Sequence, residues 1–578
     1  MSKKNNQIFG YFIIVISVLA ALIVFRPDFT GPDEPIYLSY IISIFEDGDL
    51  NIANQLYSSG DIFSISKTYN YMDYHNHGGI LLWAPFYVYA KAIYFIADRF
   101  DLIGLSEYNE EIFVRAGLSL STIIFAFFIL YFTYIICKEW FSNKIAIWSI
   151  IVMFFGTPFF YYTLFEPGNA NIIASLFSVL LILFFMYVID KGKLDWLLYG
   201  LFLSICTVLK VDLWFQVFFI FLGLITFLYR KKTKLINGLY FLLGFLIVFI
   251  LKIINDYIKY GAIHTGELGL INFNGCFFLD QLFSSFHGFF YTSPIFYCCL
   301  LGIVLVITDF LKNIKDKNIN NNTKNQILLI FSLMLIVKIV FLGYRFSWGD
   351  GTCGARPLIT EFLICVLLYA KILQKNTKPL IKYLVIIISS FAVLWNILIT
   401  SEYIGLDTFE YITKAPGIFE RVYNFKYIIS RLYSKCLYLK FVFFMPLLLG
   451  GWIIVVQLVK RSKCLPGFFL LSKQSNRVWK KFFYIFTIYL FLTYFMVTIL
   501  NIINNGRNVK KIELEGFYDK AMIITPNIFK ESHNYAELAV IRDYFEKKGD
   551  IKKVNNIQIL QKKYLEKMRK LGLDEHLP

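Results

Sequence analysis

The feature that most constrains this chain is the recurrence of apolar runs long enough to cross a bilayer. The first extends from Ile8 to Phe25, close to the roughly 20 residues that a helix needs to span a hydrocarbon core. Similar runs follow near 79–97, 111–136, 146–165, 169–189, 195–209, 211–229, 236–257, 291–310, 326–344, 357–372, 381–400, 438–459 and 480–503. Backbone polar groups in lipid must be satisfied within the protein, so such runs form helices. We therefore predict an all-α polytopic membrane protein with roughly 11–14 transmembrane helices.

The composition excludes an ordinary soluble domain. Of the 578 residues, 57% are hydrophobic, and the mean hydropathy is +0.60. The chain holds 62 Phe and 39 Tyr, which suits lipid-facing helices with aromatic belts at the membrane interfaces.

The net charge of +17 indicates membrane lipid rather than nucleic acid as a partner. Lys and Arg gather in short clusters between apolar runs, at 230–234, 311–324, 371–382 and 460–481. Such clusters mark the cytoplasmic side of a membrane protein and contact anionic lipid. This arrangement leaves a long first loop, the segments 258–290, 345–356 and 401–437, and the tail from Asn504 on the outer side.

Three regions follow from these patterns. Residues 1–400 form the main transmembrane module, 401–503 add an outer loop and further transmembrane helices, and 504–578 form a soluble C-terminal extension. Within the extension, Tyr535 to Lys547 and Ile557 to Leu571 have the periodicity of amphipathic helices. A solvated cap and a role in acceptor recognition both remain open for it.

An acidic pair, Asp33 and Glu34, follows the first apolar run and opens the long outer loop. Pro32 and Pro35 enclose the pair and restrain its backbone. A carboxylate held in this way at a membrane surface is a candidate general base. The alternative is that the pair solvates the loop or caps a helix starting near Pro35.

The same loop holds two further polar groups. Glu46, Asp47 and Asp49 supply oxygen ligands that suit a divalent cation, or they form a plain acidic turn. His75 and His77 precede the next apolar run. We expect them either to bind phosphate or a metal ion, or to anchor a helix at the membrane interface.

Two candidate positions lie between later apolar runs. Glu166 precedes Pro167 and Gly168. Its carboxylate either approaches the first loop or is part of an ordinary turn, which the Pro-Gly pair also explains. Lys210 and Asp212 separate two adjacent runs, and ionisable groups at such depth are either paired with each other or functional. For Lys210 the functional alternative is phosphate binding.

Three cationic candidates come from the later outer loops. His287 lies in the segment Ser284 to Pro294, and Arg345 and Arg356 enclose a glycine-rich segment. Guanidinium groups match the geometry of phosphate oxygens. The alternative is that the arginines bind lipid headgroups and the glycines make turns.

The order of these features resembles the GT-C superfamily of polyprenyl-phosphate-sugar-dependent glycosyltransferases, which includes protein O-mannosyltransferases and the lipid A aminoarabinose transferase. The shared plan is an N-terminal span, a long outer loop opening with an acidic pair, many helices and a late polar loop. The segments that carry the resemblance are Asp33-Glu34, His75 to Tyr87, Gly156 to Pro167, Ser284 to Pro294 and Trp348 to Pro357. The late loop departs from the family pattern, because members often carry Pro-Arg-Tyr where this chain has Ala355-Arg356-Pro357.

The resemblance implies an inverting enzyme of the bacterial cell membrane, with its active site on the outer face. It would move a sugar from a polyprenyl-phosphate-linked donor to a hydroxyl of an acceptor glycan, lipid or protein. Asp33 would be the base, and Glu34 its neighbour or alternative. Arg345, Arg356 and His287 would contact the leaving phosphate. A phosphate leaves as a stabilised anion, so no second carboxylic acid is required.

A transporter or flippase of a lipid-linked sugar is the alternative function. Lys210 and Asp212 would then belong to a translocation path. Transporters often show internal repeats, and we find no convincing repeat in this sequence. A non-enzymatic scaffold accounts for the helices but not for the placed carboxylates.

Overall fold

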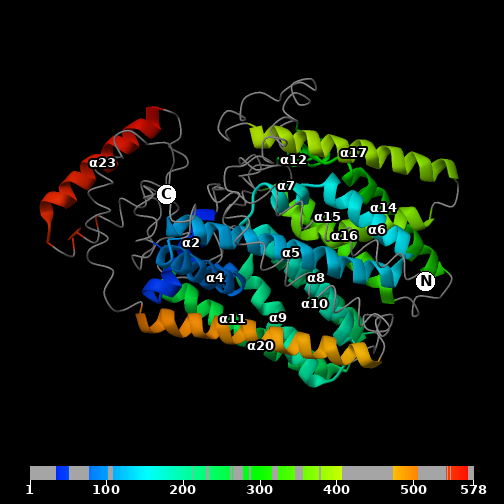
Figure 1. The fold of residues 1–578 in the computed structure, drawn as a ribbon, viewed down its shortest axis with the longest axis horizontal. Coiled ribbons are helices and arrows are strands. Elements are labelled where there is room, and N and C mark those ends of the chain that lie inside the picture. The colour runs from blue at the N-terminus through cyan, green and yellow to red at the C-terminus, as the bar shows by residue number, and fades with distance from the viewer. Residues whose placement is uncertain are drawn as a thin grey trace. The chain divides into compact units, whose positions relative to one another are not determined.

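The computed structural model describes residues 34–50, 52, 77–101, 109–189, 191–210, 212–229, 234–260, 263, 277–284, 288–315, 323–344, 356–375, 379–405, 473–504, 542, 545–546 and 549–570. Every regular element within these ranges is helical (Figure 1). In chain order they are α2 (Glu34–Ile42), the π-helix η1 (Ser43–Asp47), the 3-10 helix η2 (His77–Gly79), α4 (Ile80–Arg99), α5 (Glu110–Trp140), α6 (Asn143–Gly156), α7 (Phe159–Leu164), α8 (Ala170–Val188), α9 (Lys193–Leu209), α10 (Asp212–Tyr229), α11 (Leu235–Tyr260), α12 (Phe278–Phe283), α13 (Phe289–Thr292), α14 (Phe296–Lys315), α15 (Thr323–Leu342), the 3-10 helix η5 (Arg356–Glu361), α16 (Phe362–Lys375), α17 (Pro379–Gly405), α20 (Lys473–Asn504) and α23 (Ile551–Lys570).

The prediction of an all-α polytopic membrane protein is confirmed. Within the described residues, eight helices are long and apolar enough to cross a membrane. They are Ile80–Arg99, Glu110–Trp140, Ala170–Val188, Leu235–Tyr260, Lys324–Leu342, Arg356–Lys375, Tyr383–Ser401 and Lys480–Ile503. The predicted runs at 8–25 and 438–459 lie outside the described residues.

The chain divides into two compact units, each built from three separate segments. Unit 1 consists of Met1–Gly31, Leu82–Leu246 and Leu268–Tyr489, and unit 2 of Pro32–Leu81, Ile247–Glu267 and Leu490–Pro578. The three regions predicted from the sequence remain a prediction.

In unit 1, α6, α14, α16 and α17 pack together, and α5 packs along α8 (Figure 1). Asparagine caps help to fix where the long helices begin. The side chain of Asn109 accepts a hydrogen bond from Ile112 N at 3.1 Å at the start of α5, and Asn169 caps α8 in the same way. These caps satisfy backbone N–H groups that the first helical turn leaves without a partner.

Two predicted continuous runs are interrupted in the structure. The run at 146–165 breaks between α6 and α7 at Thr157 and Pro158, and the run at 291–310 breaks between α13 and α14 at Ser293 and Pro294. Proline lacks the N–H that a continuing helix requires. Apolar composition alone did not reveal these breaks.

Asn396 of α17 bridges both breaks and is almost fully buried. Its Nδ2 donates to Phe155 O at 2.9 Å and to Thr157 O at 3.0 Å, while its Oδ1 accepts from Ser293 Oγ at 3.2 Å. One amide thereby satisfies polar groups that the two interruptions release into a buried setting.

The directions of five helices in unit 1 are set by the contacts at their ends. The helices α8, α10 and α16 begin where α9 and α15 end, as the contacts of Lys210 and Lys338 described below establish. The opposite termini of these helices carry Lys193, Lys324, Lys371 and Lys375. Lys324, Lys371 and Lys375 belong to the predicted basic clusters, and the membrane side of this end stays a prediction.

In unit 2, the short helix α2 continues into η1, which closes at Gly48 with a left-handed φ of 74°. The amphipathic helix predicted at 557–571 is present as α23 and begins earlier, at Ile551.

Candidate functional site

Four ionisable side chains form a buried chain of alternating charge in unit 1. They are Lys210, Asp212, Lys338 and Glu361, each at most 5% exposed. Asp212 Oδ2 lies 3.7 Å from Lys210 Nζ, and Asp212 Oδ1 lies 3.4 Å from Lys338 Nζ. Lys338 Nζ in turn lies 3.2 Å from Glu361 Oε1. Two cations and two anions therefore balance, and burial of each charge is offset by a partner of opposite sign.

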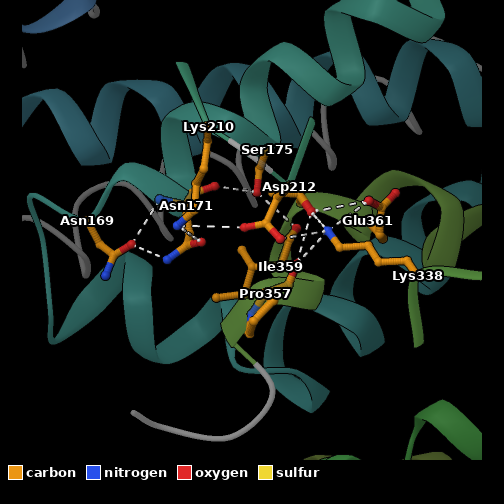
Figure 2. Close-up of polar contacts among 10 residues, drawn as sticks. Asn169, Asn171, Ser175, Lys210, Asp212, Lys338, Pro357, Ile359 and Glu361 are labelled. Carbon is orange, nitrogen blue, oxygen red and sulfur yellow. Dashed lines mark hydrogen bonds and ion pairs between the residues drawn. The ribbon is translucent and has the colours of Figure 1, made fainter. Parts of the chain in front are cut away.

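Among these four charged side chains, Lys338 lies between the two carboxylates and contacts both (Figure 2). It extends from the apolar helix α15 and is 0% exposed. Besides its contacts with the two carboxylates, its ammonium group donates to Pro357 O at 2.7 Å and to Thr360 Oγ1 at 2.6 Å. An ammonium group without such partners would be too costly to keep at this depth.

Glu361 is held on its second oxygen as well. Gln216 of α10 donates through Nε2 to Glu361 Oε2 at 3.1 Å and to Ser178 Oγ at 2.6 Å. The carboxylate thus receives bonds from helices α10 and α15 and fixes the junction of η5 with α16. Charge-assisted bonds of this kind are stronger than neutral ones.

Lys210 and Asp212 occupy the joint between α9 and α10. Lys210 adopts extended backbone angles (φ −162°, ψ 143°), which end α9. Asp212 is the first residue of α10, where the partial positive charge of the helix N-terminus favours a carboxylate. The joint is bridged by Trp214, whose Nε1 donates to Thr207 O at 3.2 Å.

The start of α8 connects this joint to η5. Asn171 accepts a bond from Lys210 Nζ at 2.6 Å through Oδ1, and its backbone N–H donates to Asn169 Oδ1 at 2.9 Å. One turn further on, Ser175 Oγ lies 2.8 Å from Asn171 O and 2.9 Å from Ile359 O. Figure 2 shows these residues converging from α8 and η5.

As a result, η5 is anchored at two backbone carbonyls. Lys338 binds Pro357 O, and Ser175 binds Ile359 O. Arg356, which opens η5, is only partly buried while the residues from Leu358 to Glu361 are buried. The network therefore fixes the backbone next to a cationic side chain at the edge of the buried core.

No family model and no curated protein matches this chain. A search of solved structures finds the chain similar to ArnT from Cupriavidus metallidurans, in a crystal structure bound to undecaprenyl phosphate. The match covers 92% of this chain and 81% of that chain, at 12% identity and a TM-score of 0.43.

Several residues predicted from the sequence cannot be placed. Asp33, His75, His287 and Arg345 lie outside the described residues. The backbone of Glu34 forms the first residue of α2, and His77 is the first residue of η2. Their proposed roles remain predictions.

The acidic group near the end of α2 is placed. Glu46 and Asp47 are exposed on η1, whereas Asp49 is buried and accepts a bond from Ser43 Oγ at 2.7 Å. Among the described residues, no group of three or more His, Cys, Asp or Glu side chains is arranged to hold a metal ion. The divalent cation suggested for Glu46, Asp47 and Asp49 therefore remains a prediction.

Glu166 is buried in the turn that leads from α7 to α8. In this turn Gly168 adopts a φ of 85°, and its N–H donates to Thr122 Oγ1 at 2.8 Å. Glu166 thus belongs to the segment that leads into the Asn169 cap. Most of the first loop lies outside the described residues, so the predicted approach of Glu166 to that loop stays a prediction.

Sequence reasoning identified Lys210 and Asp212 but missed Lys338, Glu361, Asn171 and Gln216. The pairing of Lys210 with Asp212, one of the two alternatives from the sequence, is present at 3.7 Å. Lys338 and Glu361 carried a usable signal, because a charge inside an apolar run marks a paired or functional group. Nothing in the sequence indicated that they pair with each other.

Proposed function

We propose that the chain is an inverting glycosyltransferase that uses a polyprenyl-phosphate-linked sugar as donor. One observation carries this proposal, namely the anchoring of η5 by Lys338 and Ser175, which fixes the backbone beside Arg356. A guanidinium group carried on this fixed backbone, at the edge of an apolar helical core, suits a phosphate whose lipid tail lies in the membrane.

In the proposed reaction, an acceptor hydroxyl attacks the anomeric carbon of the donor. A bond forms between the acceptor oxygen and that carbon, and the bond from the carbon to the phosphate oxygen breaks. The hydroxyl proton passes to the carboxylate of Asp33, and the polyprenyl phosphate leaves as a dianion. Attack and departure on opposite faces invert the anomeric configuration, and one general base is sufficient.

The acidic pair belongs to this proposal through its place in the chain. Asp33 immediately precedes α2, whose residues Tyr37, Leu38 and Ile41 are buried. Precise placement of a general base accounts for much of its effect, and α2 is a buried element that follows directly on Asp33 in the sequence. We assign Glu34 as the neighbour or alternative base.

Within this proposal the buried charge chain is a support for η5 rather than a translocation path. Its four charges are balanced, almost fully buried and bonded to one another or to protein carbonyls and amides. Lys210 then influences phosphate binding only indirectly, by helping to hold the η5 backbone in place.

The test uses purified protein in lipid vesicles with radiolabelled polyprenyl-phosphate sugars and a mixture of hydroxyl acceptors. Wild-type protein should release polyprenyl phosphate and form a labelled product. Asp33→Asn should lower the rate by roughly 10²–10⁴. Asp98→Asn, which removes an exposed carboxylate on α4, serves as the matched control and should leave the rate unchanged.

Two outcomes would contradict the proposal. Normal turnover by a folded Asp33→Asn protein would show that Asp33 is not the general base. Movement of labelled donor across the bilayer without cleavage of the sugar–phosphate bond would favour a transporter or flippase instead.

A further inference from the structure

A stripe of four buried polar residues runs along one face of α11 in unit 2. Lys252, Asn255, Asp256 and Lys259 follow the spacing i, i+3, i+4 and i+7, and each is at most 6% exposed. Other residues of the same helix half, such as Ile250 and Tyr257, are more than half exposed. Polar groups on the buried side of a membrane helix are expensive, and they mark positions with a function or a fixed partner.

The middle of the stripe joins α11 to α20. The Nδ2 of Asn255 lies 2.8 Å from Thr498 Oγ1 and 3.2 Å from Tyr494 Oη, and its Oδ1 accepts from Asn501 Nδ2 at 3.1 Å. These bonds set the rotation of α11 about its axis. The Lys252–Asp256 ion pair lies within α11 itself.

The end of the stripe contacts α2. Lys259 donates a hydrogen bond from Nζ to Tyr40 Oη. The ammonium group also lies 4.1 Å from the centre of the Tyr40 ring and 4.9 Å from that of Tyr260. A buried ammonium group gains from both contacts, because the ring face is negative and the hydroxyl oxygen accepts a hydrogen bond.

This contact matters because α2 is too short to hold its own position. It spans nine residues, fewer than the roughly 12–15 that an isolated helix needs. Tyr40 is 0% exposed and lies in the second turn after Glu34. The place of α2, and of Glu34 as its first residue, is therefore set by tertiary contacts such as this one.

We infer that Lys259 is a positioning residue for α2, the helix that begins at Glu34, and that it acts through Tyr40. This inference rests on the proposed function, since it gives Lys259 a role in placing the proposed base. Loss of the Lys259–Tyr40 bond should let α2 shift, and a misplacement of about 1 Å costs up to roughly 10²-fold in rate. Binding of the donor should be unaffected.

The experiment compares Lys259→Met and Tyr40→Phe with wild type. Each substitution removes one partner of the bond and keeps most of the packing volume. We expect kcat to fall by roughly 10–100-fold with the KM for donor unchanged. The double variant should be no slower than the worse single variant, because both changes break one interaction.

The control is Lys553→Met, which removes another lysine–aromatic contact in unit 2, that of Lys553 over Phe545 at 4.6 Å. It should leave kcat unchanged. Hydrogen exchange over residues 34–42 supplies a second readout that needs no activity. Both test variants should exchange faster there, and Lys553→Met should not. Tyr40→Phe keeps the test valid if Lys259→Met fails to fold.

The outcomes separate the two proposals. If wild type transfers sugar and both test variants match it in kcat and in exchange, the positioning role is wrong and the proposed function stands. If wild type does not transfer sugar but the variants loosen α2, the contact is structural and the proposed function fails. Equal losses of kcat in Lys553→Met would also overturn the positioning role.

Discussion

Lys338 and Glu361 form an ion pair in which both side chains are wholly buried, with 3.2 Å between Nζ and Oε1. Because Lys338 also holds Pro357 O, the pair couples the end of α15 to the turn that carries Arg356. Breaking such a pair on one side leaves a charge without compensation, and this costs more than the pair contributes when intact.

We therefore expect Lys338→Met to destabilise the protein by about 3–5 kcal/mol. Thermal unfolding in detergent measures this loss. The double variant Lys338→Met with Glu361→Gln should recover part of the stability, since the uncompensated charge is gone. An unchanged melting temperature in the single variant would contradict the description of the pair as buried.

A second prediction concerns the close packing of α9 against α11 in unit 1. A Cβ placed on Gly200 would lie 2.0 Å from Phe241 O, which is backbone and cannot move aside. Gly200→Ala should therefore separate the helices and cost about 1–3 kcal/mol or more.

Gly223→Ala is the matched control. Its Cβ would meet only side-chain atoms, the nearest at 3.5 Å, which is ordinary contact. It should be neutral or slightly stabilising, because alanine favours a helix. Equal melting temperatures for the two variants would show that α9 and α11 do not approach as described.

Much of this fold was predictable because apolar length and backbone satisfaction together require helices. The charges of Lys210 and Asp212 were visible between two apolar runs. The partner of Asp212 on α15 was not, because a sequence does not state which helices lie side by side. The same holds for Asn396, which reaches Thr157 O from 239 residues away.

A third prediction addresses this long-range bridge. Asn396→Leu keeps the volume of the side chain and removes all three of its hydrogen bonds. The carbonyl of Phe155 would then lose this donor, at about 1–3 kcal/mol, whereas that of Thr157 would keep the bond from Phe160 N at 3.2 Å. We expect a lower melting temperature and faster hydrogen exchange around residues 155–157.

Asn396→Gln serves as the comparison, since it keeps the amide on a longer stem. It should be less destabilising than the leucine variant. If both variants melt like wild type, water or another group must satisfy the carbonyls at the break.

The last prediction separates the role of Arg356 from that of the buried network. Arg356→Ala should raise the donor concentration needed for half-maximal transfer, because a charge-assisted bond to phosphate contributes about 1.5–3 kcal/mol. That range corresponds to roughly 10–150-fold. Arg356→Lys should recover part of the loss, since a lysine keeps the charge but not the planar fork.

Melting temperatures should not change, because Arg356 is only partly buried. A change in kcat with an unchanged donor requirement would place Arg356 outside phosphate binding, and a lower melting temperature would give it a structural role within η5.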